Sequence, residues 1–110
     1  MKKKKGSFNV NIQTVNIDGN LLKVIRAKST KMKGIDNNKP YDFDLYEIEA
    51  RSPLATRELS LIVDFINKEV SGDIVAFGSW YDLDQSTVID LLRQLIEVNQ
   101  LLRPIEFMAQ

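Results

Sequence analysis

The residues best suited to bind a ligand are the basic ones, and most of them lie in the first part of the chain. Residues 1–40 hold ten basic side chains against two acidic ones, whereas residues 41–110 hold five against thirteen, so the formal net charge of +0 hides a polarised sequence. The ten are Lys2, Lys3, Lys4, Lys5, Lys23, Arg26, Lys28, Lys31, Lys33 and Lys39. With Tyr41 and Phe43 nearby, they predict a DNA- or RNA-binding surface that attracts phosphates and stacks on bases. The alternative is that the lysines only confer solubility and the aromatic residues belong to the core.

A second candidate site centres on the aromatic pair Trp80-Tyr81, which follows Gly78 between two apolar segments. Aromatic side chains are enriched at protein interfaces. Ile89 and Ile96 extend an apolar stripe beyond one helix face, which indicates a buried helix or a dimer interface. We therefore predict a partner-binding surface formed by Trp80, Tyr81, Ile89 and Ile96, which would bind another protein or form a homodimer. The alternative is that Trp80 fills the gap between two helices.

Two pairs of carboxylates, Asp42 with Asp44 and Asp82 with Asp84, are each separated by one residue. On a strand such carboxylates share one face, and hard cations prefer oxygen ligands. Neither pair has the glycine and downstream glutamate of an EF-hand, so helix caps and edge-strand charges are the simpler explanation. The chain has no histidine and no cysteine, which removes the commonest general base and every thiolate. We therefore predict a non-enzymatic protein with no cofactor and no metal site.

Strand patterns dominate the N-terminal part of the chain. Apolar and polar residues alternate over residues 8–13, as is typical of a half-buried strand. Asp18-Gly19 is a strong signal for a two-residue hairpin turn, and the return strand is expected over residues 21–29. This turn would place Val15 opposite Leu22.

The segment between this hairpin and the next strand is polar and basic. Residues 29–39 predict an exposed loop, because they contain Gly34 and an Asn-Asn pair before Pro40. Residues 41–50 alternate again and predict a third strand. Its acidic residues would lie beside the basic hairpin, where opposite charges stabilise pairing by about 0.2–1 kcal/mol per pair.

Helical patterns are expected in the second half. Ser52-Pro53 is typical of a helix start, with a capping side chain followed by proline at the first helical position. Apolar residues at steps of three and four then predict a helix over residues 54–70. A second helix is expected to begin after a cap at Asp82 or Asp84 and to end near Val98.

These elements together predict an α+β fold. An N-terminal antiparallel sheet, made of the hairpin and the third strand, is packed by two helices, with a short strand over residues 74–77 between them. The expected organisation is a disordered basic arm at residues 1–7 and a single domain at residues 8–110.

The string Leu83-Asp84-Gln85-Ser86-Thr87-Val88-Ile89-Asp90-Leu91-Leu92-Arg93 leads through Asn99 to Leu101-Leu102-Arg103-Pro104. Over residues 55–105 the chain resembles winged helix-turn-helix domains, whose last helix and following strand have a similar polar cap, Thr-Val pair and leucine spacing. The resemblance implies that Gln85, Ser86, Thr87 and Asp90 would face a DNA groove.

Two functional classes therefore stay open. The first is a small nucleic-acid-associated accessory or regulatory protein that uses the basic arm and hairpin. The alternative is a protein-interaction module or assembly factor, homodimeric or not, with no role in nucleic-acid binding. A cytoplasmic location without membrane contact is expected, because no apolar run follows the N-terminal lysines and none is long enough to span a bilayer.

Overall fold

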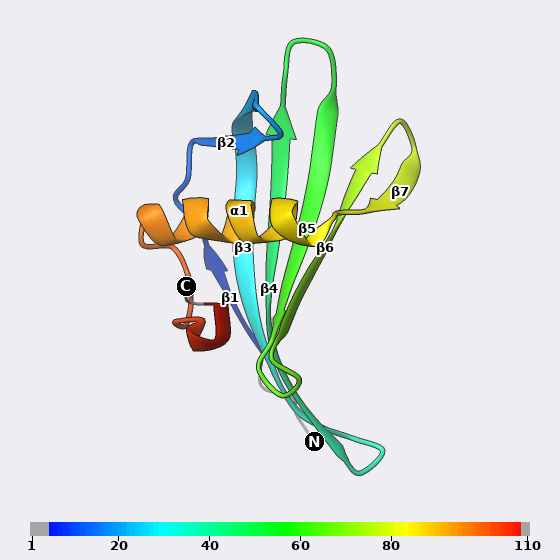
Figure 1. Ribbon diagram of the computed structural model, residues 1–110, viewed down its shortest axis with the longest axis vertical. Coiled ribbons are helices and arrows are strands. Elements are labelled where there is room, and N and C mark those ends of the chain that lie inside the picture. The colour runs from blue at the N-terminus through cyan, green and yellow to red at the C-terminus, as the bar shows by residue number, and fades with distance from the viewer. Residues whose placement is uncertain (1–4, 109–110) are drawn as a thin grey trace.

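A computed structural model of this chain describes residues 5–108, which form one antiparallel sheet with a single α-helix across it (Figure 1). The strands are β1 (Lys5–Asn9), β2 (Thr14–Ile17), β3 (Asn20–Asp36), β4 (Lys39–Arg51), β5 (Thr56–Asp64), β6 (Glu69–Ala76) and β7 (Ser79–Asp82). The helix α1 spans Gln85–Glu97, and a 3-10 turn, η1, spans Glu106–Met108. Within these residues no helix has the length and apolar character needed to cross a membrane.

The sheet is a meander in which neighbouring strands are joined by tight turns. Its order is β1-β3-β4-β5-β6-β7, and β2 also pairs with β3, so that β1 and β2 share one edge of the sheet while β7 forms the other. Asp18-Gly19, Asn37-Asn38 and Phe77-Gly78 each form a two-residue turn with positive φ at both positions. Turns of this kind match the right-handed twist of the strands they join.

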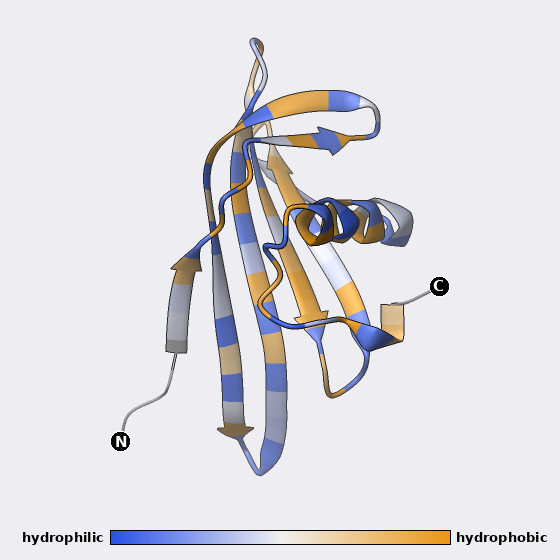
Figure 2. Cartoon of the chain, turned by 90° about the vertical axis from the view of Figure 1, so that its left-hand side faces the viewer, coloured by the Kyte–Doolittle hydropathy of each residue, from blue (hydrophilic) through white to orange (hydrophobic). Residues whose placement is uncertain are grey.

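One face of the sheet is covered and the other is open. Figure 2 shows α1 and the chain that follows it along one side of the sheet. Alternate residues of the central strands point to that side, where Tyr46 and Leu61 are buried in one apolar cluster with Leu91 of α1. Burial of each such side chain contributes about 1.5–3 kcal/mol. Leu45 and Ile62, which point to the opposite face, are only half-buried.

The predicted α+β fold with two helices packed on a small sheet is wrong, because residues 54–70 form no helix. Residues 56–64 form β5, and β6 follows after a turn. Leu59, Leu61 and Val63 recur at every second position and are all buried, which is the period of a strand. The helical spacing in the sequence arose because it combined apolar residues from both faces of this strand.

Ser52, which suggested the start of the first helix, closes a turn between strands, and Asp64 closes the next turn. Ser52 Oγ accepts the backbone N–H groups of Leu54 and Ala55, each at 3.3 Å, in the loop between β4 and β5. Asp64 Oδ1 accepts two backbone N–H groups, each at 3.0 Å, in the turn between β5 and β6. Serine and aspartate side chains accept hydrogen bonds from backbone N–H groups in turns as well as at helix starts. Their presence in the sequence therefore does not distinguish a turn from a helix start.

Several other sequence predictions are confirmed. The hairpin at Asp18-Gly19 forms with Val15 opposite Leu22. The third strand is present as β4, and the last helix is present as α1, with Asp84 as its N-cap residue.

The extent of three N-terminal and central segments differs from expectation. The prediction of an exposed loop over residues 29–39 is wrong, because β3 continues to Asp36 and almost all of β3 pairs with β4. Of the expected arm, residues 1–4 lie outside the described residues, while Lys5–Ser7 belong to β1. The short strand over residues 74–77 is the end of the longer β6, and the chain after it turns back as β7.

The resemblance to winged helix-turn-helix domains does not extend to the fold. Residues 55–105 form β5, β6, β7 and α1. A helix-turn-helix needs a helix packed before the recognition helix. Between residues 55 and 84 the chain forms strands and turns, so α1 has no preceding helix to pack against.

Candidate interaction surface

The basic residues of β3 lie opposite the acidic residues of β4, as predicted for the third strand. The register places Arg26 opposite Glu49 and Lys28 opposite Glu47. Arg26 Nη2 lies 2.7 Å from Glu49 Oε1, and this hydrogen bond raises the pKa of Arg26. Lys28 Nζ lies 3.7 Å from Glu47 Oε1. Positive charge on this part of the sheet is therefore accompanied by negative charge on the adjacent strand.

The other basic residues of β3 point the opposite way. Since successive residues of a strand alternate between faces, Arg26 and Lys28 lie on the open face, whereas Lys31 and Lys33 lie on the face that carries α1. Lys31 and Lys33 stand opposite two aspartates of β4. The predicted nucleic-acid-binding residues are thus divided between two faces, and each group lies beside carboxylates.

The remaining predicted basic residues are also separated. Lys2–Lys4 lie outside the described residues, and the backbone of Lys5 begins β1. Lys23 lies near the start of β3 and Lys39 at the start of β4, so they lie at opposite ends of this pair of antiparallel strands. These residues do not extend the paired charges into a continuous basic surface.

The carboxylates of Asp42 and Asp44 bind an arginine from the C-terminal segment. Arg103 Nη2 lies 2.7 Å from Asp44 Oδ1, and Nη1 donates to Asp42 Oδ2 at 3.1 Å. The guanidinium carbon lies 3.8 Å from the centre of the Phe65 ring. We call these four residues the guanidinium clamp. It fastens the chain after α1 to the sheet, and it places a cation of the protein itself beside the carboxylate pair.

Charge and burial act together in the guanidinium clamp. The hydrogen bond from Arg103 lowers the pKa of Asp42, although partial burial opposes this shift. Burial would lower the pKa of Arg103, but the hydrogen bonds and charges of Asp44 and Asp42 outweigh it and raise that pKa. Nearby, the hydroxyl of Tyr46 accepts the backbone N–H of Leu102 at 2.7 Å, and burial raises the pKa of Tyr46 to about 12.

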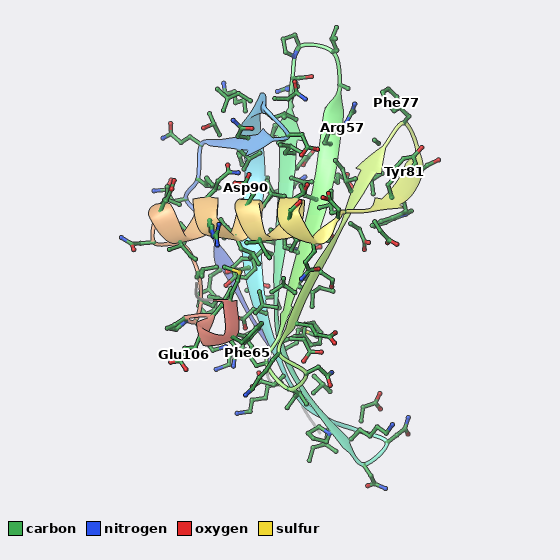
Figure 3. The ribbon with its side chains drawn as sticks, viewed as in Figure 1. Arg57, Phe65, Phe77, Tyr81, Asp90 and Glu106 are labelled. Atoms are coloured by element: carbon green, nitrogen blue, oxygen red, sulfur yellow. The ribbon has the colours of Figure 1, made fainter. Side chains whose placement is uncertain are left out.

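The β6–β7 hairpin presents aromatic side chains to solvent. Phe77 is 84% exposed and Trp80 is 68% exposed, and Tyr81 is also exposed. The guanidinium carbon of Arg57 lies 4.6 Å from the centre of the Phe77 ring, and Figure 3 shows these two residues with Tyr81 at one end of the sheet. Phe77 has a φ of 53°, which is unfavourable for a bulky side chain. The turn therefore holds an aromatic ring at the tip of the hairpin at a conformational cost.

Apolar side chains from two other turns extend this surface along the same end of the sheet. Leu54, in the β4–β5 loop, is 94% exposed, and Leu21, at the start of β3, is exposed as well. They border a groove of about 570 Å³ that also contacts Ile74 and Arg57. Since Arg57 both lines the groove and stacks on Phe77, the groove and the hairpin are continuous. We call the surface formed by Leu21, Leu54, Phe77, Trp80 and Tyr81 the hairpin end.

Three acidic residues, Glu58, Asp73 and Asp82, lie near Trp80 on the open face. The register places Trp80 and Glu58 on either side of Val75, and Asp73 directly opposite Asp82. The charge of Glu58 helps to raise the pKa of Arg26 on β3, whereas among the described residues no basic side chain forms an ion pair with Asp73 or Asp82. Partial burial raises the pKa of Asp73, and the hydrogen bond and negative charge of Asp82 raise it further. This edge of the sheet therefore carries surplus negative charge, unlike the β3–β4 pair.

The residues of α1 that the winged-helix resemblance assigned to DNA binding differ in their exposure to solvent. Gln85, Ser86 and Asp90 are exposed. Thr87 is buried, and its hydroxyl donates to Asp84 Oδ1 at 2.6 Å, which lowers the pKa of Asp84. Thr87 therefore stabilises the start of α1 and is not available to a groove.

The predicted partner-binding residues are only partly brought together. Trp80 and Tyr81 lie next to each other on β7, although their side chains point to opposite faces of the sheet. Ile89 is half-buried against the core. Ile96 is exposed but lies in the last turn of α1, on the far side of the sheet from β7 (Figure 1). The predicted gap-filling role of Trp80 between two helices does not apply, because the segment predicted as the first of these helices forms β5 and the start of β6.

Sequence reasoning missed Phe77, Glu58 and Asp73 as parts of this surface. Phe77 precedes Gly78, and this pair separates two short stretches of alternating residues. A two-residue turn containing glycine between such stretches is the pattern of a hairpin. That signal would have placed Asp73 and Asp82 opposite each other, but the assignment of residues 54–70 to a helix concealed Glu58.

Comparisons with protein-family models, with curated proteins and with solved structures found no match to this chain. The geometry and charge of its surface are therefore the observations on which a functional proposal rests.

Proposed function

We propose that this chain is a non-enzymatic protein-interaction module that contacts its partner through the hairpin end. The observation that carries the proposal is the gathering of exposed Leu21, Leu54, Phe77 and Trp80 at one end of the sheet. Single exposed apolar residues are common on soluble proteins, but an apolar surface that continues from the groove at Leu21 and Leu54 through Arg57 to Phe77 indicates an interaction site, with Trp80 on the other face of the same hairpin. The proposal keeps the cytoplasmic location that was expected from the sequence.

The backbone of the β6–β7 turn supports this assignment. Phe77 occupies a position with φ of 53° where glycine or asparagine would be less strained. Its ring does not enter the core and is 84% exposed. Strain that is retained without a gain in packing is often found at functional sites. Arg57 stacks on this ring, with its guanidinium carbon 4.6 Å from the ring centre, and so holds the ring at the hairpin tip.

The nucleic-acid hypothesis receives less support from the geometry. Binding to a polyanion requires several cations that reach phosphates together. Arg26 and Lys28 pair with glutamates, and Lys31 and Lys33 lie on the other face. The hypothesis stays testable by a gel-shift series with single- and double-stranded DNA at two salt concentrations.

Site-specific photo-cross-linking tests the proposed function. A photoreactive phenylalanine analogue would replace Phe77 in the full chain, in the cells that produce this protein. The matched control carries the same analogue at Ile35, which is 76% exposed and lies beside the β3–β4 turn at the other end of the sheet. We expect discrete protein adducts from position 77 that Trp80→Ala weakens, and none of these adducts from position 35. Equal adducts from both positions, or none from position 77, would contradict the proposal.

A further inference from the structure

We propose that the free edge of β7 binds an extended segment of a partner protein whose alternate residues are lysine or arginine. The segment would add to the sheet as a further strand, and its cationic side chains would lie beside Trp80, Asp73 and Asp82. This inference rests on the proposed function, which it makes more specific by naming the chemistry of the partner.

The backbone of β7 offers hydrogen bonds on its outer side. The N–H of Leu83 donates to the carbonyl of Gly72 at 2.9 Å, in register with the β6–β7 pairing. Bonded and non-bonded residue pairs alternate along antiparallel strands. Ser79 and Tyr81 therefore bond to β6, whereas Trp80 and Asp82 direct their N–H and carbonyl groups outward. Exposed edges of this kind bind extended peptides by strand addition.

The non-bonded pair of Asp73 and Asp82 adds a preference for positive charge. Side chains approach most closely at such pairs, so two carboxylates meet there directly. Burial of Asp73, together with the hydrogen bond and the charge of Asp82, raises the pKa of Asp73 above its ordinary value, as expected for two carboxyl groups that face each other. A lysine or arginine on an added strand would lie one strand spacing, about 4.8 Å, from Asp82 of β7, and its positive charge would relieve the repulsion between the two carboxylates.

Trp80 supplies an aromatic surface on the same face. Its side chain borders a hollow of about 290 Å³ that also contacts Glu58 and, on β3, Arg26 and Lys28, which are paired with Glu49 and Glu47. A cation stacked on an indole ring next to a carboxylate gains from both interactions. Because side chains of a strand repeat every second residue on one face, a partner with cations at alternate positions would reach Trp80 and the two aspartates together.

Charge complementarity favours this occupant over the alternatives. A second copy pairing through its own β7 would bring another Glu58, Asp73 and Asp82 against the first set, which like-charge repulsion opposes. A polyanion would meet the same repulsion. A cationic strand meets no basic side chain at Asp73 and Asp82, the cations Arg26 and Lys28 in the adjoining hollow are already paired with glutamates, and the strand satisfies the outward backbone groups of Trp80 as well.

Fluorescence of Trp80 provides a direct test, because the chain contains a single tryptophan. The full chain would be titrated with a blocked octapeptide of four Thr-Lys repeats, and with a Thr-Glu octapeptide as the charge-reversed control. We expect a saturable change in emission with the Thr-Lys peptide that weakens as salt is added. Absence of a saturable change, or equal binding of the Thr-Glu peptide, would overturn the inference.

Two further comparisons separate strand addition from simple charge attraction. In the double variant Asp73→Asn/Asp82→Asn, we expect the dissociation constant for the Thr-Lys peptide to rise roughly fivefold to tenfold. The control Glu106→Gln removes an exposed carboxylate that lies well away from Tyr81, on the other side of α1, and should leave the dissociation constant unchanged (Figure 3). A Thr-Lys peptide N-methylated at alternate residues, made in both registers, should lose binding in at least one register. Undiminished binding of both methylated peptides would overturn strand addition.

The outcomes also distinguish this inference from the proposed function. Photo-cross-linked adducts at position 77 without binding of the Thr-Lys peptide would overturn the cationic-strand inference and leave the interaction module standing. A change in Trp80 emission with protein concentration alone, together with a dimer in sedimentation that Trp80→Ala abolishes, would assign the edge to a second copy and would likewise overturn it.

Discussion

Replacing Arg103 with methionine is expected to destabilise the protein strongly, because it removes the cation of the guanidinium clamp. The side chain of Asp44 is only 1% exposed and lies 2.7 Å from Arg103 Nη2, so the substitution leaves a buried carboxylate without a counter-charge. Breaking a buried pair in this way costs about 3–5 kcal/mol. Arg103 keeps 23% of its side chain exposed, so we expect a value near the lower limit, about 3 kcal/mol. Methionine retains the apolar stem, so the loss reports mainly on charge.

Urea unfolding followed by circular dichroism measures this cost. With an m value of about 1–3 kcal/mol per M, the midpoint should fall by about 1–3 M. The matched control is Arg26→Met, which breaks the solvent-exposed pair with Glu49 and should have a much smaller effect. The double variant Arg103→Met/Asp44→Asn should recover part of the loss, because it removes the uncompensated charge. If Arg103→Met shifts the midpoint no more than Arg26→Met does, the clamp does not stabilise the fold as argued.

Three further predictions concern stability. Tyr46→Phe should cost about 1–3 kcal/mol in urea unfolding, because the N–H of Leu102 loses its acceptor, and an unchanged midpoint would refute this role. Asp82→Asn should raise the unfolding free energy by about 0.2–1 kcal/mol at low salt, because it removes the like charge opposite Asp73, and the gain should shrink at high salt. The lowered pKa of Asp42 means that its contribution is complete above its ordinary value of 3.8 and is lost as the pH falls through the lowered value. Acid unfolding at fixed urea should therefore be less steep below about pH 4 in Asp42→Asn than in the unsubstituted chain.

The sequence predicted local structure well where a pattern was compatible with only one kind of secondary structure. Asp18-Gly19 requires positive φ at both positions, which few turns other than a two-residue hairpin provide, and the register followed from it. The long leucine-rich stripe of α1 cannot be a strand, so the helix was predicted correctly. Both assignments depend on contacts within a short stretch of chain.

The prediction of a helix over residues 54–70 was wrong for a physical reason. Leu61, Ile62 and Val63 are consecutive apolar residues, so the segment satisfies helical and strand spacing equally well. What decides the structure is pairing with β4 on one side and β6 on the other, which depends on residues far away in the sequence. Tertiary contacts of this kind outweigh local propensity.

The candidate site was predictable only in part, for the same reason. Trp80 and Tyr81 were identified by residue type, because aromatic residues in a polar segment stand out. Glu58 and Asp73 become neighbours of Trp80 only through the pairing of β5, β6 and β7. The basic residues show the reverse effect, since their separation in the sequence from the acidic residues disappears when β3 pairs with β4.

The most direct test of the central claim is a paired titration of the full chain, followed by Trp80 emission at about 0.15 M salt, where screening acts beyond roughly 8 Å. One arm uses the Thr-Lys octapeptide and the other uses single-stranded DNA of matched length. Our account predicts saturable binding of the cationic peptide and no saturable response to the DNA. Saturable binding of DNA that is lost when Lys28, Lys31 and Lys33 are neutralised, with no response to the peptide, would contradict it.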